Sequence, residues 1–253
     1  MRRTLALLVA MSFTPALCAA VFAQAISVNP APTRKVRLLA NVNYSLTERS
    51  FDETSTFTSF LEEGSLSQSY IGGTGIGFEI GGIYSITPSV GILGSFELST
   101  TDHDAMFEVE VPHPLLFNQN RSVSGELPGL THSEQAVNVD GVYTARSGSI
   151  VVDVFGGATL FFTETELLDE ATTSSVYPFD ELVLAGTTTV ELTDNPIGFN
   201  VGAAFTYEIT SVVGVSFQAR YSAATATLER DNGSTVDIDV GGIRVGGGIR
   251  IAF

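Results

Sequence analysis

Residues 241–253 read GGIRVGGGIRIAF, and this stretch decides the fold. Apolar side chains alternate in it with glycine and arginine, a pattern typical of a β-strand with two different faces. One face carries Ile243, Val245, Ile249, Ile251 and Phe253. The other carries Arg244, Gly246, Gly248 and Arg250. A strand that is apolar on one side and polar on the other fits the wall of a membrane barrel, between lipid and lumen.

Seven further segments alternate in the same way. They span residues 36–46, 76–84, 90–98, 137–144, 150–163, 199–207 and 213–221. The charged side chains of these segments lie on the face where a soluble β-sandwich would need its core. We therefore predict an all-β fold, an eight-stranded antiparallel up-and-down transmembrane β-barrel over residues 35–253. The stretches 107–111 and 182–192 also alternate, and they would give ten strands if they crossed the membrane rather than extending above it as hairpins.

The connections between these segments are of two kinds. Three are short and follow Tyr84, Tyr143 and Tyr207. Four are long, at residues 47–69, 99–135, 164–196 and 223–235, and they alternate with the short ones. Short periplasmic turns and long extracellular loops are typical of outer-membrane barrels. Four aromatic residues end the descending strands, and four lie high on the ascending ones. We expect two interfacial girdles: Tyr84, Tyr143, Tyr207 and Phe253 at the lower interface, and Tyr44, Phe96, Phe162 and Tyr221 at the upper one.

The first residues have the features of an export signal. Arg2 and Arg3 precede an apolar stretch that ends in small residues near Ala23 and Ala25. We expect a signal peptide over residues 1–25, a short periplasmic segment over residues 26–34, and an outer-membrane location. The only cysteine, Cys18, leaves with the peptide, so the barrel has no disulfide.

The charge of the chain is strongly negative. Its formal net charge of −16 becomes −18 once the two arginines of the signal peptide are removed. Nucleic acid is therefore excluded as a partner. Outer-membrane lipid and an extracellular ligand of the acidic loops, which the sequence does not identify, remain as expected partners.

Charged side chains on the inward faces are the candidate functional residues. They are Arg37, Glu79, Glu97, Asp140, Asp153, Arg220, Arg244 and Arg250. An eight-stranded barrel has room for little more than its own side chains. Four acids and four arginines are expected to pair and to plug the lumen, because an unpaired buried charge is costly. A narrow porin-like channel for ions or small solutes is the alternative.

Catalytic and metal-binding patterns are weak. His103, between Asp102 and Asp104, and His113 are expected to be solvated loop side chains, so we predict no metal and no cofactor. His132 and Ser133 suggest a lipid hydrolase, but adjacent residues of a strand point to opposite faces. We therefore predict that the protein is not an enzyme, with an outer-membrane enzyme acting on lipid as the remaining alternative.

The closing strand and the hairpin FNVGAAFTYEITSVVGVSFQARY (199–221) resemble the barrel domain of OmpA-type and opacity-type outer-membrane proteins. The resemblance implies that the barrel-assembly machinery recognises the last strand through Phe253. Because no peptidoglycan-binding domain follows Phe253, that role of the larger OmpA proteins does not carry over. We expect a structural or surface-interaction role through the long acidic extracellular loops.

Overall fold

The computed structural model describes residues 34–230 and 233–253, so the predicted signal peptide and residues 26–33 lie outside the described part of the chain. No helix among the described residues is long and apolar enough to span a bilayer. The strands are β1 (Val36–Ser45), β2 (Ser50–Ser59), β3 (Glu62–Gly72), β4 (Ile76–Ser85), β5 (Val90–Pro112), β6 (Asn120–Ser147), β7 (Ile150–Val176), β8 (Glu181–Asp194), β9 (Ile197–Glu208), β10 (Val213–Glu229) and β11 (Thr235–Ala252).

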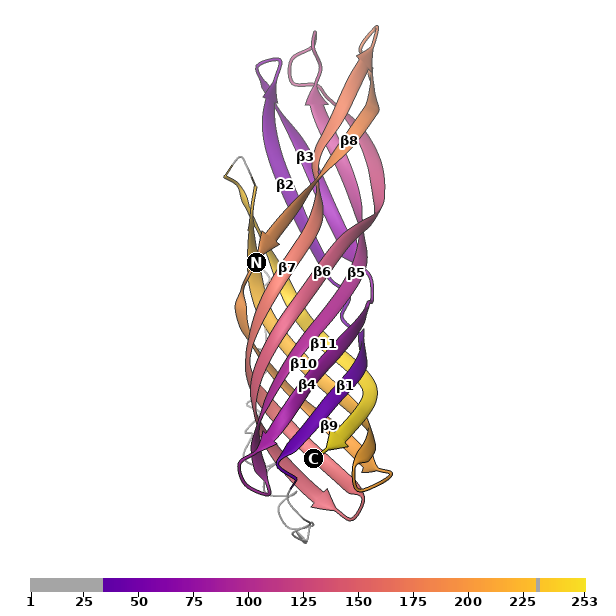
Figure 1. Ribbon diagram of the computed structural model, residues 1–253. Coiled ribbons are helices and arrows are strands. Elements are labelled where there is room, and N and C mark those ends of the chain that lie inside the picture. Colours follow the sequence, from indigo (N-terminus) through magenta and orange to yellow (C-terminus); the bar gives the residue numbers. More distant parts are fainter. Residues whose placement is uncertain (1–33, 231–232) are drawn as a thin grey trace, which may run out of the picture.

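Eight strands close a ring in the order β1, β4, β5, β6, β7, β9, β10, β11, with β11 returning to β1 (Figure 1). All neighbours in the ring are antiparallel. The closing pair runs in register from Arg37 opposite Ala252 to Ser45 opposite Arg244. The prediction of an eight-stranded up-and-down barrel is confirmed, and the ten-stranded alternative is wrong.

The prediction of long extracellular loops is corrected by the structure. The strands β5, β6, β7, β10 and β11 continue far above the closed ring. There β3 pairs with β5, β8 pairs with β7, and β2 pairs with β3. Residues 107–111 and 182–192 lie in these hairpins, as preferred from the sequence. Residues 50–59 read SFDETSTFTS, and this hydroxyl-rich strand shows too little alternation to be recognised. The result is an extension of paired strands in place of loops.

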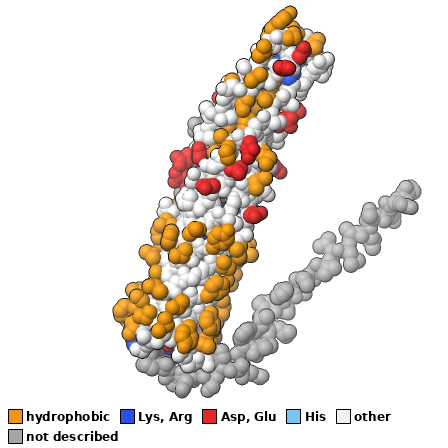
Figure 2. Space-filling model, turned by 90° about the vertical axis from the view of Figure 1, so that its right-hand side faces the viewer, with side chains coloured by type: hydrophobic (Ala, Val, Ile, Leu, Met, Phe, Trp, Pro, Cys, Tyr) orange, Lys and Arg blue, Asp and Glu red, His pale blue; other side chains and the backbone are white. Residues whose placement is uncertain are grey.

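The lower half of the molecule carries an apolar belt (Figure 2). The eight aromatic residues predicted for the girdles lie on the outer wall of the barrel. Tyr84, Tyr143, Tyr207 and Phe253 are all exposed near the periplasmic ends of their strands. Above the belt, the surface carries a zone of acidic side chains (Figure 2). A closed sheet with an apolar outer belt satisfies its backbone hydrogen bonds internally, as a bilayer requires.

The extension has a hydrophobic core of its own. One cluster contains Tyr70, Phe161, Leu167, Leu228 and Ile238, among others. A second, nearer the tip, contains Leu66, Phe107, Val109, Val111 and Leu168. Most of these side chains come from strands that also form the membrane wall, whereas Leu66 and Tyr70 lie on β3. The core explains why the segments above the membrane fold as strands, since each hairpin buries one apolar face against the others.

Candidate functional site

The lumen contains all eight charged side chains that alternation assigned to it, and each is at most 7% exposed. Three layers arise from them and their neighbours. Nearest the periplasm, Arg37 forms a two-pronged ion pair with Asp153, with Nη2–Oδ1 at 2.8 Å and Nη1–Oδ2 at 2.9 Å. Thr144 completes this group, because its hydroxyl donates to Asp153 Oδ1 at 2.6 Å and accepts from Arg37 at 2.8 Å.

An apolar layer follows, which the sequence analysis did not predict. It consists of Leu39, Ile83, Leu93, Val142, Phe155 and Ala204. These residues occupy inward positions between the polar ones, so the lumen is not lined by polar residues throughout. The sequence signal that could have revealed this layer is that its residues stand at inward positions of the alternation. The larger apolar set of each strand faces lipid, and these six residues stand at the opposite parity.

Arg220 is the centre of the next layer. Its Nη2 lies 2.9 Å from Glu79 Oε1 and 3.8 Å from Asp140 Oδ2, and its Nη1 lies 3.7 Å from Glu97. The guanidinium also covers the ring of Phe155, 4.9 Å from its centroid. Amide side chains complete the layer, with Asn41 donating to Glu79 at 2.8 Å. One cation thus serves three carboxylates in the narrow centre of the barrel.

Arg244 connects this layer to the top of the lumen. Its Nη1 lies 3.2 Å from Glu97, and its Nη2 contacts Glu134, a buried carboxylate. Glu134 also pairs with Arg49 Nη1 at 2.7 Å. The sequence analysis placed neither residue in the network, although Glu134 shares the parity of Asp140 on the same strand. With them the network has five arginines and five carboxylates, counting Arg250, which donates to the Gln218 amide oxygen at 3.2 Å.

Arg49 acts as a clasp across the top of the barrel. From the connection between β1 and β2 it reaches Glu134 on β6 and the Gly241 carbonyl oxygen on β11. Gly241 has φ +96°, and a Cβ there would lie 2.4 Å from the Ser222 carbonyl oxygen. Glycine is therefore required where the clasp meets β11. Below the clasp, Leu46 N donates to Ile243 O at 2.8 Å and seals the wall.

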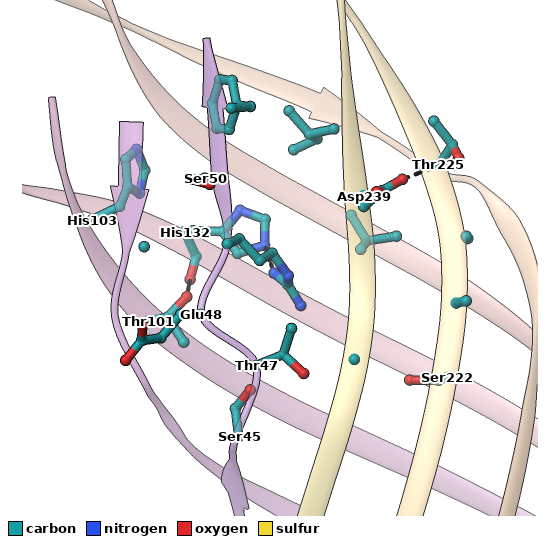
Figure 3. A pocket seen from close by; sticks show the side chains of 18 of the residues that line it. Ser45, Thr47, Glu48, Ser50, Thr101, His103, His132, Ser222, Thr225 and Asp239 are labelled. Atoms are coloured by element: carbon teal, nitrogen blue, oxygen red, sulfur yellow. Dashed lines mark hydrogen bonds between the residues drawn. The ribbon is translucent and has the colours of Figure 1, made fainter. Parts of the chain in front are cut away.

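Above the clasp, β2 and β11 are not paired with each other in the described chain, and a cavity of about 790 Å³ opens between them. Figure 3 shows His103, His132 and Thr101 on one side of this cavity and Ser222, Thr225 and Asp239 on the other. Phe199, Tyr221 and Ile243 of the apolar belt also line it. Above it, Arg230 bridges the gap through Glu53, with Nη2–Oε2 at 2.8 Å. The cavity is a window in the wall above the sealed lumen.

Two histidines at the window are buried, so the expectation that His103 is solvated is wrong. His103 lies edge-on to Tyr70 and contacts the Glu166 carbonyl oxygen at 2.9 Å. Its pKa is lowered mainly by burial, because desolvation disfavours the charged imidazolium. Burial likewise raises the pKa of Tyr70 to about 12. The same expectation is wrong for His113, which is buried at the tip. The described residues contain no cluster of three metal-ligating side chains.

His132 contacts a hydroxyl and a carboxylate through its two ring nitrogens. Nδ1 lies 2.7 Å from Thr165 Oγ1, and Nε2 lies 3.0 Å from Glu134 Oε1. His132 is buried, whereas Ser133 is only partly so, on the opposite face of β6. The pair that suggested a hydrolase is therefore separated by the strand. The Thr165 hydroxyl takes the place beside the imidazole.

Comparison with known proteins shows the fold. No protein-family model matches the chain, and no curated protein matches its sequence. The outer-membrane protein OprG from Pseudomonas aeruginosa is 13% identical, with a TM-score of 0.52, over 90% of this chain and 99% of OprG. Neisserial surface protein A is 11% identical over 86% of this chain and 97% of its own, with a TM-score of 0.45. The fold shared with OprG and the apolar belt confirm the predicted outer-membrane location.

Proposed function

We propose that the chain is a closed outer-membrane barrel of the OmpA and opacity type whose extension serves interactions at the cell surface. The observation that carries this proposal is the extension itself. Its strands continue above the belt, it has its own core, and its exterior is acidic. A barrel that served only as a membrane anchor would need none of this structure. The paired strands and separate core of the extension support presentation of a fixed surface to a partner.

The layers in the lumen support a closed barrel rather than a channel. A solute would have to displace the Arg37–Asp153 pair, the apolar layer and the Arg220 cluster in turn. Separating any of these buried ion pairs leaves an uncompensated charge, which costs several kcal/mol. The window above the clasp gives access from the side to the top of the lumen only. The narrow-channel alternative therefore requires rearrangement of at least three layers.

Planar-bilayer recording tests the closed lumen. The refolded full chain, with folding checked by its heat-dependent electrophoretic mobility, is expected to show no steady conductance. Double replacement of Arg220 and Glu79 by alanine removes a central ion pair and is still expected to give no steady conductance, because the Arg37–Asp153 pair and the apolar layer continue to close the lumen. Steady conductance of the unmodified chain would contradict the proposal and favour the channel.

The interaction role requires a test on cells. Cells that display the full chain are expected to adhere to surfaces or to other cells more than cells that display a barrel with β2, β3, β8 and the upper parts of the long strands replaced by short turns. Equal adherence of the two strains, at equal surface amounts, would count against a role for the extension.

We also propose that the protein has no enzymatic activity. Thr165 beside His132 is only 1% exposed, although both side chains line the window. Glu134 is held by Arg49 and Arg244 and is thereby committed to the ion network. Incubation of the folded protein with phospholipid is expected to release no fatty acid. Release that His132→Ala abolishes would establish the enzyme alternative.

The last strand supports recognition by the barrel-assembly machinery. β11 ends beside the exposed Phe253, whose backbone N donates to Val36 O at 2.9 Å. We propose that the machinery binds this strand before β1 pairs with it. Phe253→Ser is expected to lower the amount of folded barrel in cells, and unchanged amounts would contradict this role.

A further inference from the structure

The far end of the extension carries large apolar side chains that contact little of their own chain. They belong to three hairpin turns: Phe60 and Leu61 between β2 and β3, Leu115, Leu116 and Phe117 between β5 and β6, and Tyr177 between β7 and β8. We call these six residues the distal platform. Leu61 is 92% exposed, Tyr177 80% and Phe117 73%. Figure 1 shows the three turns at the same end of the molecule, and Figure 2 shows apolar side chains at that end again, above the acidic zone.

Side-chain contacts join the three turns to one another. The buried Arg121 on β6 donates to Ser175 Oγ and to the Phe179 carbonyl oxygen, both at 2.8 Å, and so connects the second turn to the third. Glu62 Oε1 accepts from Asn118 N at 2.8 Å and connects the first turn to the second. Such contacts hold the apolar side chains in a fixed arrangement. The distal platform is therefore a preformed surface rather than three independent turns.

Backbone conformation at the platform indicates a role beyond folding. Phe60 and Leu61 have φ of +53° and +69°, and Phe179 beside Tyr177 has φ +80°. Bulky residues rarely occupy this region, and two-residue hairpin turns of this kind favour Asn and Gly. Replacing Phe60 and Leu61 by those residues would relieve the strain. Strain that persists at an exposed site points to a function of the side chains themselves.

Charge narrows the choice of partner. The described cations above the belt are Arg49, Arg121 and Arg230, and each is already engaged within the chain. Acids such as Glu63 and Asp180 surround the platform. An anionic surface would be repelled by this rim. The partner must offer an apolar phase without net negative charge.

We infer that the distal platform inserts into the outer layer of a zwitterionic lipid bilayer facing the cell. The inference deepens the proposed surface-interaction role and rests on it. The protruding side chains need an apolar phase, and Leu, Phe and Tyr are suited to the interfacial region of a bilayer. The most exposed of them project from turns, so they fit a fluid layer without a matching pocket. The acidic rim then remains among the headgroups, next to the choline cations.

Vesicle flotation tests this inference. The full chain is placed in nanodiscs, so that its own belt is covered, and mixed with vesicles of phosphatidylcholine. The protein is expected to float with them, whereas empty nanodiscs do not. Phe60→Asn with Leu61→Gly, and separately Phe117→Ser with Tyr177→Ser, is expected to lower the bound fraction about tenfold or more, since each pair withdraws two large apolar side chains from lipid.

Met106→Ser is the matched control, because Met106 is 51% exposed on the outer face of β5 below the platform. It is expected to bind vesicles like the unmodified chain. Adding phosphatidylglycerol to the vesicles should weaken binding at low salt, and salt should restore part of it.

Three results would overturn the inference. They are no flotation of the unmodified chain, equal flotation of the platform variants, and stronger binding to phosphatidylglycerol vesicles. Retention on immobilised polylysine without vesicle binding would also overturn it and would assign the acidic rim to a basic protein. If vesicles are not bound while extension-dependent adherence persists, only this inference fails and the proposed function stands.

Discussion

The barrel and the extension share β5, β6, β7, β10 and β11 but have opposite polarity. Along β5, every second residue points inward from Gly91 to Val111 without interruption. In the barrel the inward positions include Ser95 and Glu97, and in the extension they include Phe107 and Val109. The outward positions change in the reverse direction. The backbone pattern is therefore continuous, and only the solvent outside has changed from lipid to water.

This inversion shows what stabilises each region. The extension is an ordinary soluble sheet structure, whose apolar residues leave water on folding. The barrel has lipid outside, so its lumen can be held by buried ion pairs and amide hydrogen bonds. Substitutions of the same kind should thus have different effects in the two regions.

The largest effect is expected in the lumen. Arg220→Met leaves Glu79 and Asp140 without their shared cation, and it should lower the free energy of unfolding by about 3–5 kcal/mol. Urea titration in micelles measures this change. The double variant with Glu79→Gln should recover part of the loss. Unchanged stability of Arg220→Met would show that the network contributes little.

Truncating a side chain in the core of the extension should lower the stability of the extension alone. Leu228 is fully buried there, and Leu228→Ala should destabilise the extension by about 3 kcal/mol. Protease digestion should then cleave above the belt, while the heat-dependent mobility of the barrel stays the same. Val183→Ala, at an exposed position of β8, is the control. Simultaneous unfolding of both regions would show that they are one cooperative unit.

An arginine introduced on the outer face should cost more stability where that face meets lipid than where it meets water. Ile80→Arg introduces a cation in the middle of the apolar belt and should cost about 2–3 kcal/mol. Met106→Arg, on the outer face of the same sheet in the extension, should change stability by less than about 0.5 kcal/mol. Folding titrations into vesicles measure both. Similar costs would place the membrane boundary higher than the belt indicates.

The smallest effect is expected from pH. Because burial lowers the pKa of His103, the unfolded chain binds its proton first as pH falls below the ordinary value of 6.5. The extension should therefore lose stability as pH falls from 6.5 toward the lowered pKa. Glu166 and Asp104 favour the charged form, and His132 opposes it. Protease sensitivity between pH 7 and 5, compared with His103→Gln, measures the effect, and an identical profile in the variant would exclude His103 as its source.

Much of the barrel was predictable, because lipid outside and polar side chains inside give each strand a clear alternation. The eight strands and the inward face of Arg244 follow from that rule. The strands of the extension were harder to predict from the sequence. Along β5 the parity is kept while polarity inverts near residues 99–103, and along β6 and β7 the parity itself shifts at register irregularities, between Leu127 and Leu130 and between Leu168 and Glu170. The lipid-facing pattern therefore stops, and the continuing strands resemble loops. Glu134 and Arg49 were not predicted as members of the network, because their roles depend on which strands meet at the top of the ring.

The Arg49 clasp also has a consequence for timing. It joins the connection after the first strand to the Gly241 carbonyl oxygen, 192 residues later, and to Glu134 between them. Contacts between such distant residues form only after the intervening chain has taken its place. During biogenesis the clasp can therefore form only when the first and last strands have met, so a spectroscopic probe at Arg49 would report the moment of barrel closure.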